Sequence, residues 1–215
     1  MPIRLLDLLS EHPSVWWSPN TYNVRFCLHY KGLEFETQGV HYPQVKAVSQ
    51  GLGLKSTGQG MDYTLPVLVD SDGTVVRDSY EIVKYLDGKY PERPVLDEHV
   101  DNWLVAIRKV GTPLAPIAKG NVPSILDADD RKYFTTTREL GPAPADSMQN
   151  AKAALQPIID TLNRQMYLGG SEPTYADFFL ASIFIWVKRG SEEKFEELVS
   201  STALTAWWQR VHQWE

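Results

Sequence analysis

Hydrophobic positions along the chain change from strand-like to helical spacing, and residues 63–90 show both patterns most clearly. Two Val-rich runs, Leu65–Asp70 and Thr74–Asp78, flank a short segment in which Gly73 can supply a positive φ. This arrangement predicts a β-hairpin. Directly afterwards, apolar and aromatic residues recur at the spacing of a helix, namely Tyr80, Ile82, Val83, Leu86 and Tyr90. The stretch therefore predicts a strand, a tight turn, a second strand and a helix.

The preceding residues predict two strands with a helix between them. The apolar run at residues 4–9 is one strand candidate, although its pattern is equivocal, and the alternating residues 35–42 are the second. Ser18-Pro19 predicts the start of the helix, because serine is a favoured N-cap and proline a favoured first helical residue, and Gly32 predicts its end. Residues 44–61 contain four glycines and predict a loop with at most a short helix. The predicted order is thus β-α-β-(α)-β-β-α.

The second part of the chain is predicted to be entirely helical. Residues 91–96 include two prolines, which resist helix formation, and predict a linker. Beyond them a helical stripe of apolar residues begins at Val100, and Pro113 and Pro116 are expected to bend or stop that helix. Thr174 and Asp177 form a capping-box pattern that opens the most apolar helix. The other predicted helices are 127–140, 148–166 with a kink at Pro157, 192–199 and 202–214.

Composition and charge exclude several classes of protein. Of the 215 residues, 43% are hydrophobic and 22% are charged, which argues against a disordered chain. The net charge of −6, with no basic block, argues against nucleic acid or an anionic membrane surface as a partner. The lone cysteine, Cys27, excludes an intrachain disulfide framework and a Cys-based zinc site. No apolar run of membrane-spanning length and no signal-peptide pattern is found, so we expect a cytoplasmic location.

The polar residues do not predict a metal site or a hydrolase. The acidic residues at 127–130 are better explained as the charged start of a helix than as metal ligands. Ser18 has no nearby histidine that would suggest a catalytic triad. No histidine shows the spacing of a metal ligand, at His12, His29, His41, His99 or His212.

Two details of residues 63–90 concern chemistry. Leu65-Pro66 opens the first strand of the hairpin. Its peptide bond is either trans, as in most X-Pro pairs, or cis, with the preceding carbonyl and amide turned toward a ligand. Asp78-Ser79 at the helix start is either a simple N-cap or a cap that also holds a charged group of a ligand. The residue types alone leave these alternatives open.

In this order, the motifs T-L-P-V-L and D-S-x-x-I-x-x-Y-L resemble the glutathione-binding core of the cytosolic glutathione transferases. The resemblance implies a thioredoxin-like α/β domain (βαβαββα) over residues 1–92 and an all-α helical domain over residues 97–215. It also implies that Leu65-Pro66 is cis and that the backbone of Leu65 pairs with the cysteinyl unit of glutathione. Asp78 and Ser79 would hold the γ-glutamyl end.

Within that superfamily, the segment W-S-P-N-T-Y-N-V-R-F, together with the two motifs, most resembles the fungal etherase-related class called FuA, and more distantly the bacterial β-etherases. This resemblance places Ser18 at the catalytic position and implies further glutathione contacts from Asn20, Lys55 and Gln59. A serine hydroxyl at a helix N-terminus favours a thiolate, because both the donated hydrogen bond and the helix end stabilise the negative charge. The alternative is that Ser18 only caps the helix.

The electrophile site is expected between the two domains, at Trp17, Tyr22, Trp103 and Ile107, and core packing is an equally good explanation for the last two. We therefore expect a glutathione transferase of the serine type, which joins the glutathione thiolate to hydrophobic aromatic electrophiles. A glutathione-dependent carrier with weak turnover, a β-etherase and a structural member of the fold are the alternatives. Glutathione is the expected co-substrate, and the resemblance implies a homodimer.

Overall fold

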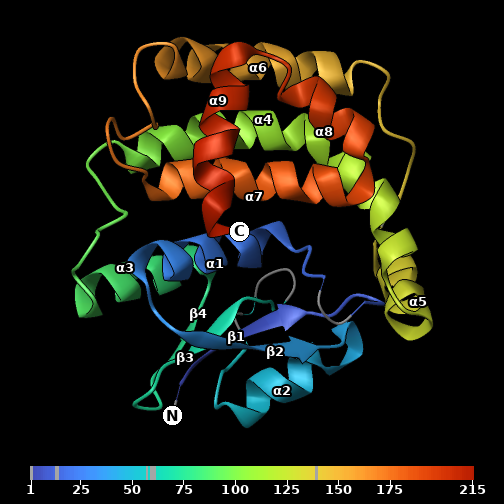
Figure 1. The fold of residues 1–215 in the computed structure, drawn as a ribbon. Helices are drawn as coiled ribbons and strands as arrows, with labels where there is room; N and C mark the ends of the chain where they lie inside the picture. The colour runs from blue at the N-terminus through green and yellow to red at the C-terminus, as the bar shows by residue number, and fades with distance from the viewer. Residues whose placement is uncertain (1, 13–14, 57, 59–61, 139) are drawn as a thin grey trace.

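The computed structural model describes residues 2–12, 15–56, 58, 62–138 and 140–215, which form a small sheet beneath a larger helical layer (Figure 1). The first part of the chain has the order strand, helix, strand, helix, hairpin, helix that the sequence predicts. Its elements are β1 (Ile3–Leu8), α1 (Pro19–Lys31), β2 (Phe35–Val40), α2 (Val45–Gly51), β3 (Val67–Val69), β4 (Val75–Arg77) and α3 (Ser79–Lys89).

The four strands form one mixed sheet in the order β2-β1-β3-β4. Strand β1 pairs in parallel with β2 and antiparallel with β3, and β3 pairs antiparallel with β4. Parallel neighbours need a crossover, and α1 supplies it between β1 and β2. The arrangement confirms the predicted thioredoxin-like fold.

Helix α1 lies between the sheet and the helical layer (Figure 1). It begins after Ser18, with Pro19 in its first turn, and ends at Gly32, whose φ of 69° is the left-handed conformation that glycine adopts readily. The ring of Phe26 on α1 stacks on Phe178 of the helical layer, with 5.7 Å between centroids. On the sheet side, Arg25 forms a buried ion pair with Asp7 of β1, at 3.2 Å. Helix α1 therefore contacts the helical layer through Phe26 and the sheet through Arg25.

The helical layer follows a connection that contains Pro91 and Pro94, and its helices lie at or near the predicted positions. They are α4 (Val100–Asn121), α5 (Ala128–Thr137), α6 (Ser147–Leu162), α7 (Tyr175–Gly190), α8 (Glu192–Leu198) and α9 (Thr202–Val211). One hydrophobic cluster runs through both layers, from Leu5 of β1 to Trp207 of α9. The domain boundaries at residues 92 and 97 stay a prediction.

Helix α4 is longer than the prolines led us to expect. It continues through Pro113 and Pro116 to Asn121, so of the two predicted outcomes, a bend or a stop, the stop was wrong. Pro157 likewise lies inside α6 without ending it. The close packing of α4 against α6 and α7 offsets the hydrogen bonds that the prolines remove.

The predicted capping box at the start of α7 is present. Asp177 is fully buried and accepts hydrogen bonds from the backbone N–H groups of Thr174 and Leu168 and from the indole of Trp207. Because the same carboxylate binds α7, the preceding loop and α9, it fixes the centre of the helical layer. Within the described part of the chain, no helix is both long and apolar enough to cross a membrane.

Candidate active site

A cavity of about 690 Å³ opens where the N-terminus of α1 faces the helical layer. Its sheet-side wall includes Trp17, Ser18, Asn20, Lys46 and Leu65. Its opposite wall comes from three helices, α4, α5 and α7, and includes Ala115, Lys119, Tyr133, Phe134, Arg138 and Trp186. Residues far apart in the sequence therefore enclose one space of ligand size.

Ser18 lies on the wall of this cavity, at the N-terminus of α1. It has the extended backbone of an N-cap, and its carbonyl accepts the N–H groups of Thr21 and Tyr22. Its side chain, however, makes no capping hydrogen bond. The hydroxyl is thus not occupied by the helix, and the backbone N–H of Asn20 beside it makes no hydrogen bond with another described residue. Two donors of one helix end remain for a ligand at this point.

Leu65 lies on the same wall, and its peptide bond to Pro66 is cis, as predicted. Strand β3 begins at Val67, so Leu65 lies just outside the sheet. Neither the N–H nor the carbonyl of Leu65 makes a backbone hydrogen bond to a described residue. Both groups can therefore pair with an extended peptide-like ligand.

Asp78 and Ser79 stand at the start of α3, as the motif implied. Asp78 has a φ of 71°, which is uncommon for a residue other than glycine, and one carboxylate oxygen accepts the N–H groups of Tyr80 and Glu81. Its other carboxylate oxygen has no hydrogen-bond partner among the described residues. Asp78 therefore caps α3 with one carboxylate oxygen, and its other oxygen is available to a second partner. Neither Asp78 nor Ser79 lines the cavity described above.

The resemblance also implied glutathione contacts from Lys55 and Gln59, and these two residues have different outcomes. Lys55 is exposed and does not line the cavity, and Gln59 lies outside the described residues. The lysine on the sheet-side wall of the cavity is Lys46, on α2. The sequence did not predict this position, because the glycines of residues 44–61 indicated a loop with at most a short helix.

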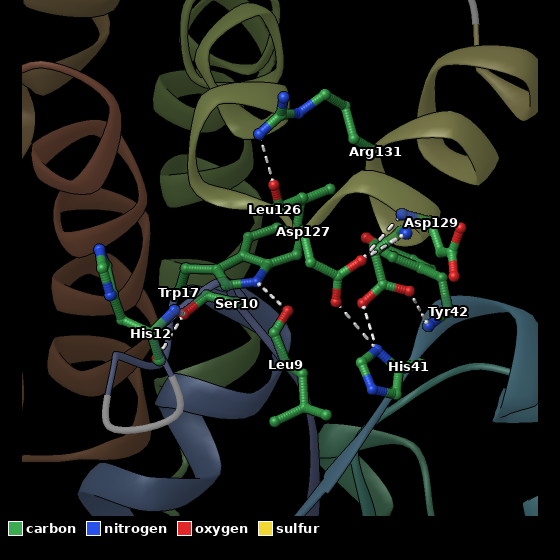
Figure 2. Close-up of polar contacts among 11 residues, drawn as sticks. Leu9, Ser10, His12, Trp17, His41, Tyr42, Leu126, Asp127, Asp129 and Arg131 are labelled. Atoms are coloured by element: carbon green, nitrogen blue, oxygen red, sulfur yellow. Dashed lines mark hydrogen bonds and ion pairs between the residues drawn. The ribbon is translucent and has the colours of Figure 1, made fainter.

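Of the four residues expected at the electrophile site, Trp17 alone lines the cavity. Its indole N–H donates to the carbonyl of Leu9 at 3.2 Å (Figure 2). Tyr22 is 3% exposed, and its hydroxyl accepts a hydrogen bond from Arg189 at 3.1 Å. Burial raises the pKa of Tyr22 and Arg189 opposes the rise, so this phenol stays neutral.

Trp103 and Ile107 belong to the hydrophobic core rather than to the cavity wall. Ile107 is completely buried, and Trp103 packs against the same cluster. Because α4 does not end at its prolines, its second half reaches the cavity instead, through Ala115 and Lys119. Ala115 lies about 12 Å further along the helix than Ile107, at 1.5 Å per residue.

Aromatic residues that the sequence did not single out line the cavity beside α5. Tyr42 stacks on Tyr133, with 5.9 Å between ring centroids, and also contacts Phe134. The guanidinium of Arg138 lies over the rings of Tyr42 and Phe134, at 4.6 and 4.5 Å. The spacing of Phe134 and Arg138, four residues apart in the predicted helix 127–140, was a signal in the sequence for this contact.

His41 connects the end of β2 to α5, beside the cavity (Figure 2). Its Nδ1 lies 3.0 Å from Asp130 and 3.2 Å from Asp127, and the hydrogen bond to Asp130 raises the pKa of His41. These three side chains are close enough to share a cation, which the sequence spacing did not suggest. Asp130 also accepts the N–H of Tyr42, and Asp127 caps α5, so protein donors already engage both carboxylates.

Comparison with known proteins identifies the family. Residues 17–89 match the family model of the glutathione S-transferase N-terminal domain, and residues 101–214 match that of the C-terminal domain. The chain belongs to the glutathione S-transferase family. Members of this family use glutathione as a co-substrate, so the enzyme class predicted from the two motifs is confirmed.

Relatives of this glutathione S-transferase are found among fungi. It is 26% identical to the glutathione S-transferase-like protein ustS of Aspergillus flavus, over 99% of this chain and 91% of that protein. The crystal structure of glutathione transferase GSTFuA3 from Phanerochaete chrysosporium matches with a TM-score of 0.87 and 28% identity, covering 100% of this chain and 98% of that one. A glutathione complex of a Ceriporiopsis subvermispora enzyme matches with a TM-score of 0.86 and 26% identity, at the same coverage. The predicted FuA-like character is therefore confirmed.

Proposed function

We propose that this glutathione S-transferase is of the serine type and joins the glutathione thiolate to hydrophobic aromatic electrophiles. The observation that carries the proposal is Ser18, which caps α1 through its backbone while its hydroxyl makes no capping bond on the cavity wall. A donated hydrogen bond from this hydroxyl and the free N–H of Asn20 would both favour the charged sulfur.

Glutathione is proposed to lie along the sheet-side wall. The N–H and carbonyl of Leu65 would pair with its cysteinyl unit, and Asp78 with Ser79 would hold the γ-glutamyl end. The amino group of that end carries a positive charge, which suits the free oxygen of Asp78. Lys46 is better placed than Lys55 to meet the glycyl carboxylate, because Lys46 lines the cavity.

The reaction needs an electrophile held against the sulfur by the opposite wall. The thiolate attacks an electron-poor carbon, a sulfur–carbon bond forms, and the leaving group departs with its electron pair. If that leaving group is a phenolate, the same step is the cleavage of an aryl ether, which is the β-etherase alternative. The aromatic residues around the cavity would hold a flat acceptor by stacking.

Two measurements test this proposal. Calorimetry with glutathione should give saturable binding, and a chromogenic aryl halide should be turned over in its presence. Binding without turnover across a small panel of aryl halides and aryl ethers would favour the carrier function instead. A protein that does not bind glutathione would contradict both.

The resemblance to cytosolic glutathione transferases also supports a homodimer and a cytoplasmic location as proposals. Sedimentation velocity at micromolar concentration tests the first, and a single species of monomer mass would count against it. Fractionation of the producing cells tests the second, and recovery of the protein outside the cytoplasmic fraction would contradict it.

A further inference from the structure

The side chain of Arg189 contacts the chain on both sides of Ser18. Arg189 lies in the last turn of α7, which packs against α1 (Figure 1). Its Nε donates a hydrogen bond to the carbonyl of Trp16 at 3.1 Å, two residues before Ser18. Its Nη2 donates to the hydroxyl of Tyr22 at 3.1 Å, four residues after Ser18. A single guanidinium therefore joins the loop before α1 to the first turns of that helix.

These two contacts hold the backbone that carries the Ser18 hydroxyl. Because a peptide unit is planar, a hydrogen bond to the carbonyl of Trp16 also orients the N–H of Trp17, the residue directly before Ser18. On the other side, the N–H of Tyr22 donates to the carbonyl of Ser18 at 2.9 Å. The residue whose hydroxyl meets Arg189 is thus itself bonded to Ser18.

The hydroxyl of Ser18 depends on this backbone for its position. It makes no capping hydrogen bond that would fix it from within α1. The backbone therefore sets where the hydroxyl lies on the cavity wall. A group that must meet a reacting atom tolerates little displacement, since a shift of about 1 Å can reduce a rate about a hundredfold.

Arg189 is placed to act on the sulfur through position rather than through its charge. Neither Arg189 nor its partners Trp16 and Tyr22 line the cavity. The charge of Arg189 is also paired, because its Nη2 lies 2.9 Å from a carboxylate oxygen of Glu215. An ion pair has a weaker field than a lone cation, so the structural connection between Arg189 and the sulfur runs through Ser18.

Resting on the proposed serine-type function, we propose that Arg189 is a positioning residue, which holds the Ser18 hydroxyl where it meets the sulfur of glutathione. It does so through the carbonyl of Trp16 and the hydroxyl of Tyr22. A guanidinium suits this role, because its donors point in fixed directions and serve several acceptors at once. One wall of the glutathione site is thus adjusted from the helical layer.

A double-mutant cycle between Arg189 and Ser18 tests this role. The readout is the thiol pKa of bound glutathione, from thiolate absorbance against pH. In the wild type, Ser18→Ala should raise this pKa by about one to two units, the loss of one hydrogen bond to a charged group. Arg189→Met should by itself raise it by about one unit or more, and Ser18→Ala should then add less than about 0.5 unit. Two unconnected effects would instead add.

Steady-state kinetics with a chromogenic aryl halide gives a second readout. In Arg189→Met, kcat near neutral pH should fall about tenfold or more, because less of the bound glutathione is thiolate. The KM for glutathione should stay within about twofold, because the proposed contacts of Leu65 and Asp78 do not involve Arg189. A merely structural role, in which part of the protein unfolds, would not separate kcat from KM in this way.

Three variants control for charge and stability, and thermal unfolding shows that each is folded. Glu215→Gln removes a charge but keeps an oxygen for Arg189, so the thiol pKa should stay within about 0.3 unit. Arg189→Lys keeps the charge without the planar fork. It should still raise the thiol pKa, and its cycle with Ser18→Ala decides the outcome if Arg189→Met does not fold. Arg210→Met is the matched control, because Arg210 of α9 also donates to a backbone carbonyl, that of Met166 at 2.8 Å, and does not line the cavity.

The outcomes separate this inference from the function on which it rests. Identical titration curves for the wild type and Ser18→Ala would contradict the serine-type function, and the role of Arg189 with it. A full effect of Ser18→Ala in the Arg189→Met or Arg189→Lys background would overturn the inference alone. An equally raised thiol pKa in Arg210→Met would also overturn it, and so would a wild-type pKa in Arg189→Lys, because charge would then suffice.

Discussion

Replacing Ser18 by alanine distinguishes a catalytic hydroxyl from a helix cap. If Ser18 were only a cap, its loss would cost about 0.5–2 kcal/mol of stability. In the structure the hydroxyl makes no capping hydrogen bond. We therefore expect the free energy of unfolding of Ser18→Ala to lie within about 0.5 kcal/mol of that of the wild type, at or below the smallest cost of losing a capping bond.

The same substitution should change the ionisation of bound glutathione. A free thiol has a pKa of about 8.5, and a hydrogen bond to a charged group contributes about 1.5–3 kcal/mol. At 1.36 kcal/mol per pKa unit, the loss of such a bond raises the pKa of the bound thiol by about one to two units. The helix N-terminus and the N–H of Asn20 remain, so activity near neutral pH should fall by about one to two orders of magnitude without vanishing.

The assay is the ultraviolet absorbance of the bound thiolate, titrated against pH for both proteins. Ser201→Ala is the matched control, because the hydroxyl of Ser201 does cap α9, by accepting the N–H of Leu204 at 3.3 Å. That variant should lose about 1 kcal/mol of stability and keep the thiol pKa of the wild type. Superimposable titration curves for the wild type and Ser18→Ala would refute the catalytic role and transfer the sulfur contact to Asn20.

Three further predictions follow from single contacts. Asp78→Ala should raise the calorimetric Kd for glutathione about tenfold, since one charge-assisted bond is lost, whereas unchanged affinity in a folded variant would remove Asp78 from the site. The pKa of His41 is raised by Asp130, so its ion pair stabilises the fold below the unfolded value of about 6.5 and is lost as pH rises through the folded pKa. The difference in melting temperature between the wild type and His41→Gln should therefore decrease as the pH rises, and a constant difference would contradict this. Asp177→Ala leaves the indole of Trp207 and two backbone N–H groups without an acceptor and should cost at least about 3 kcal/mol in denaturant unfolding; a loss under about 1 kcal/mol would show that water replaces the carboxylate.

Local signals explain what the sequence could predict. The bounds of α1 follow from Ser18, Pro19 and Gly32, each of which acts within one turn of the helix. The hairpin and the capping box at Thr174 are likewise set by neighbouring residues. The position of Ser18 on the cavity wall followed from the order of the elements, because a loop after β1 leads to the start of α1.

The opposite wall of the cavity could not be predicted in this way. Which half of α4 reaches the cavity depends on whether α6 and α7 hold the helix together at Pro113 and Pro116, and that packing is not local. The contact of Tyr42 with Tyr133 joins residues about ninety positions apart. His41 meets Asp130 across a similar separation, so neither pair leaves a pattern in a short window of sequence.

The stack of Phe26 on Phe178 bears on how such enzymes can be recombined. Exchanging the helical half between relatives would be an attractive way to obtain new acceptor specificity, because the glutathione half would be kept. Helix α1, however, packs against α7, and the ring of Phe178 from α7 stacks on Phe26. A chimera joined at the connection after α3 would bring a foreign residue opposite Phe26 and disturb the helix whose first turn presents Ser18. A better exchange therefore replaces only α5 and the end of α4, which form the cavity wall opposite the sheet. Helices α1 and α7 then stay those of one protein.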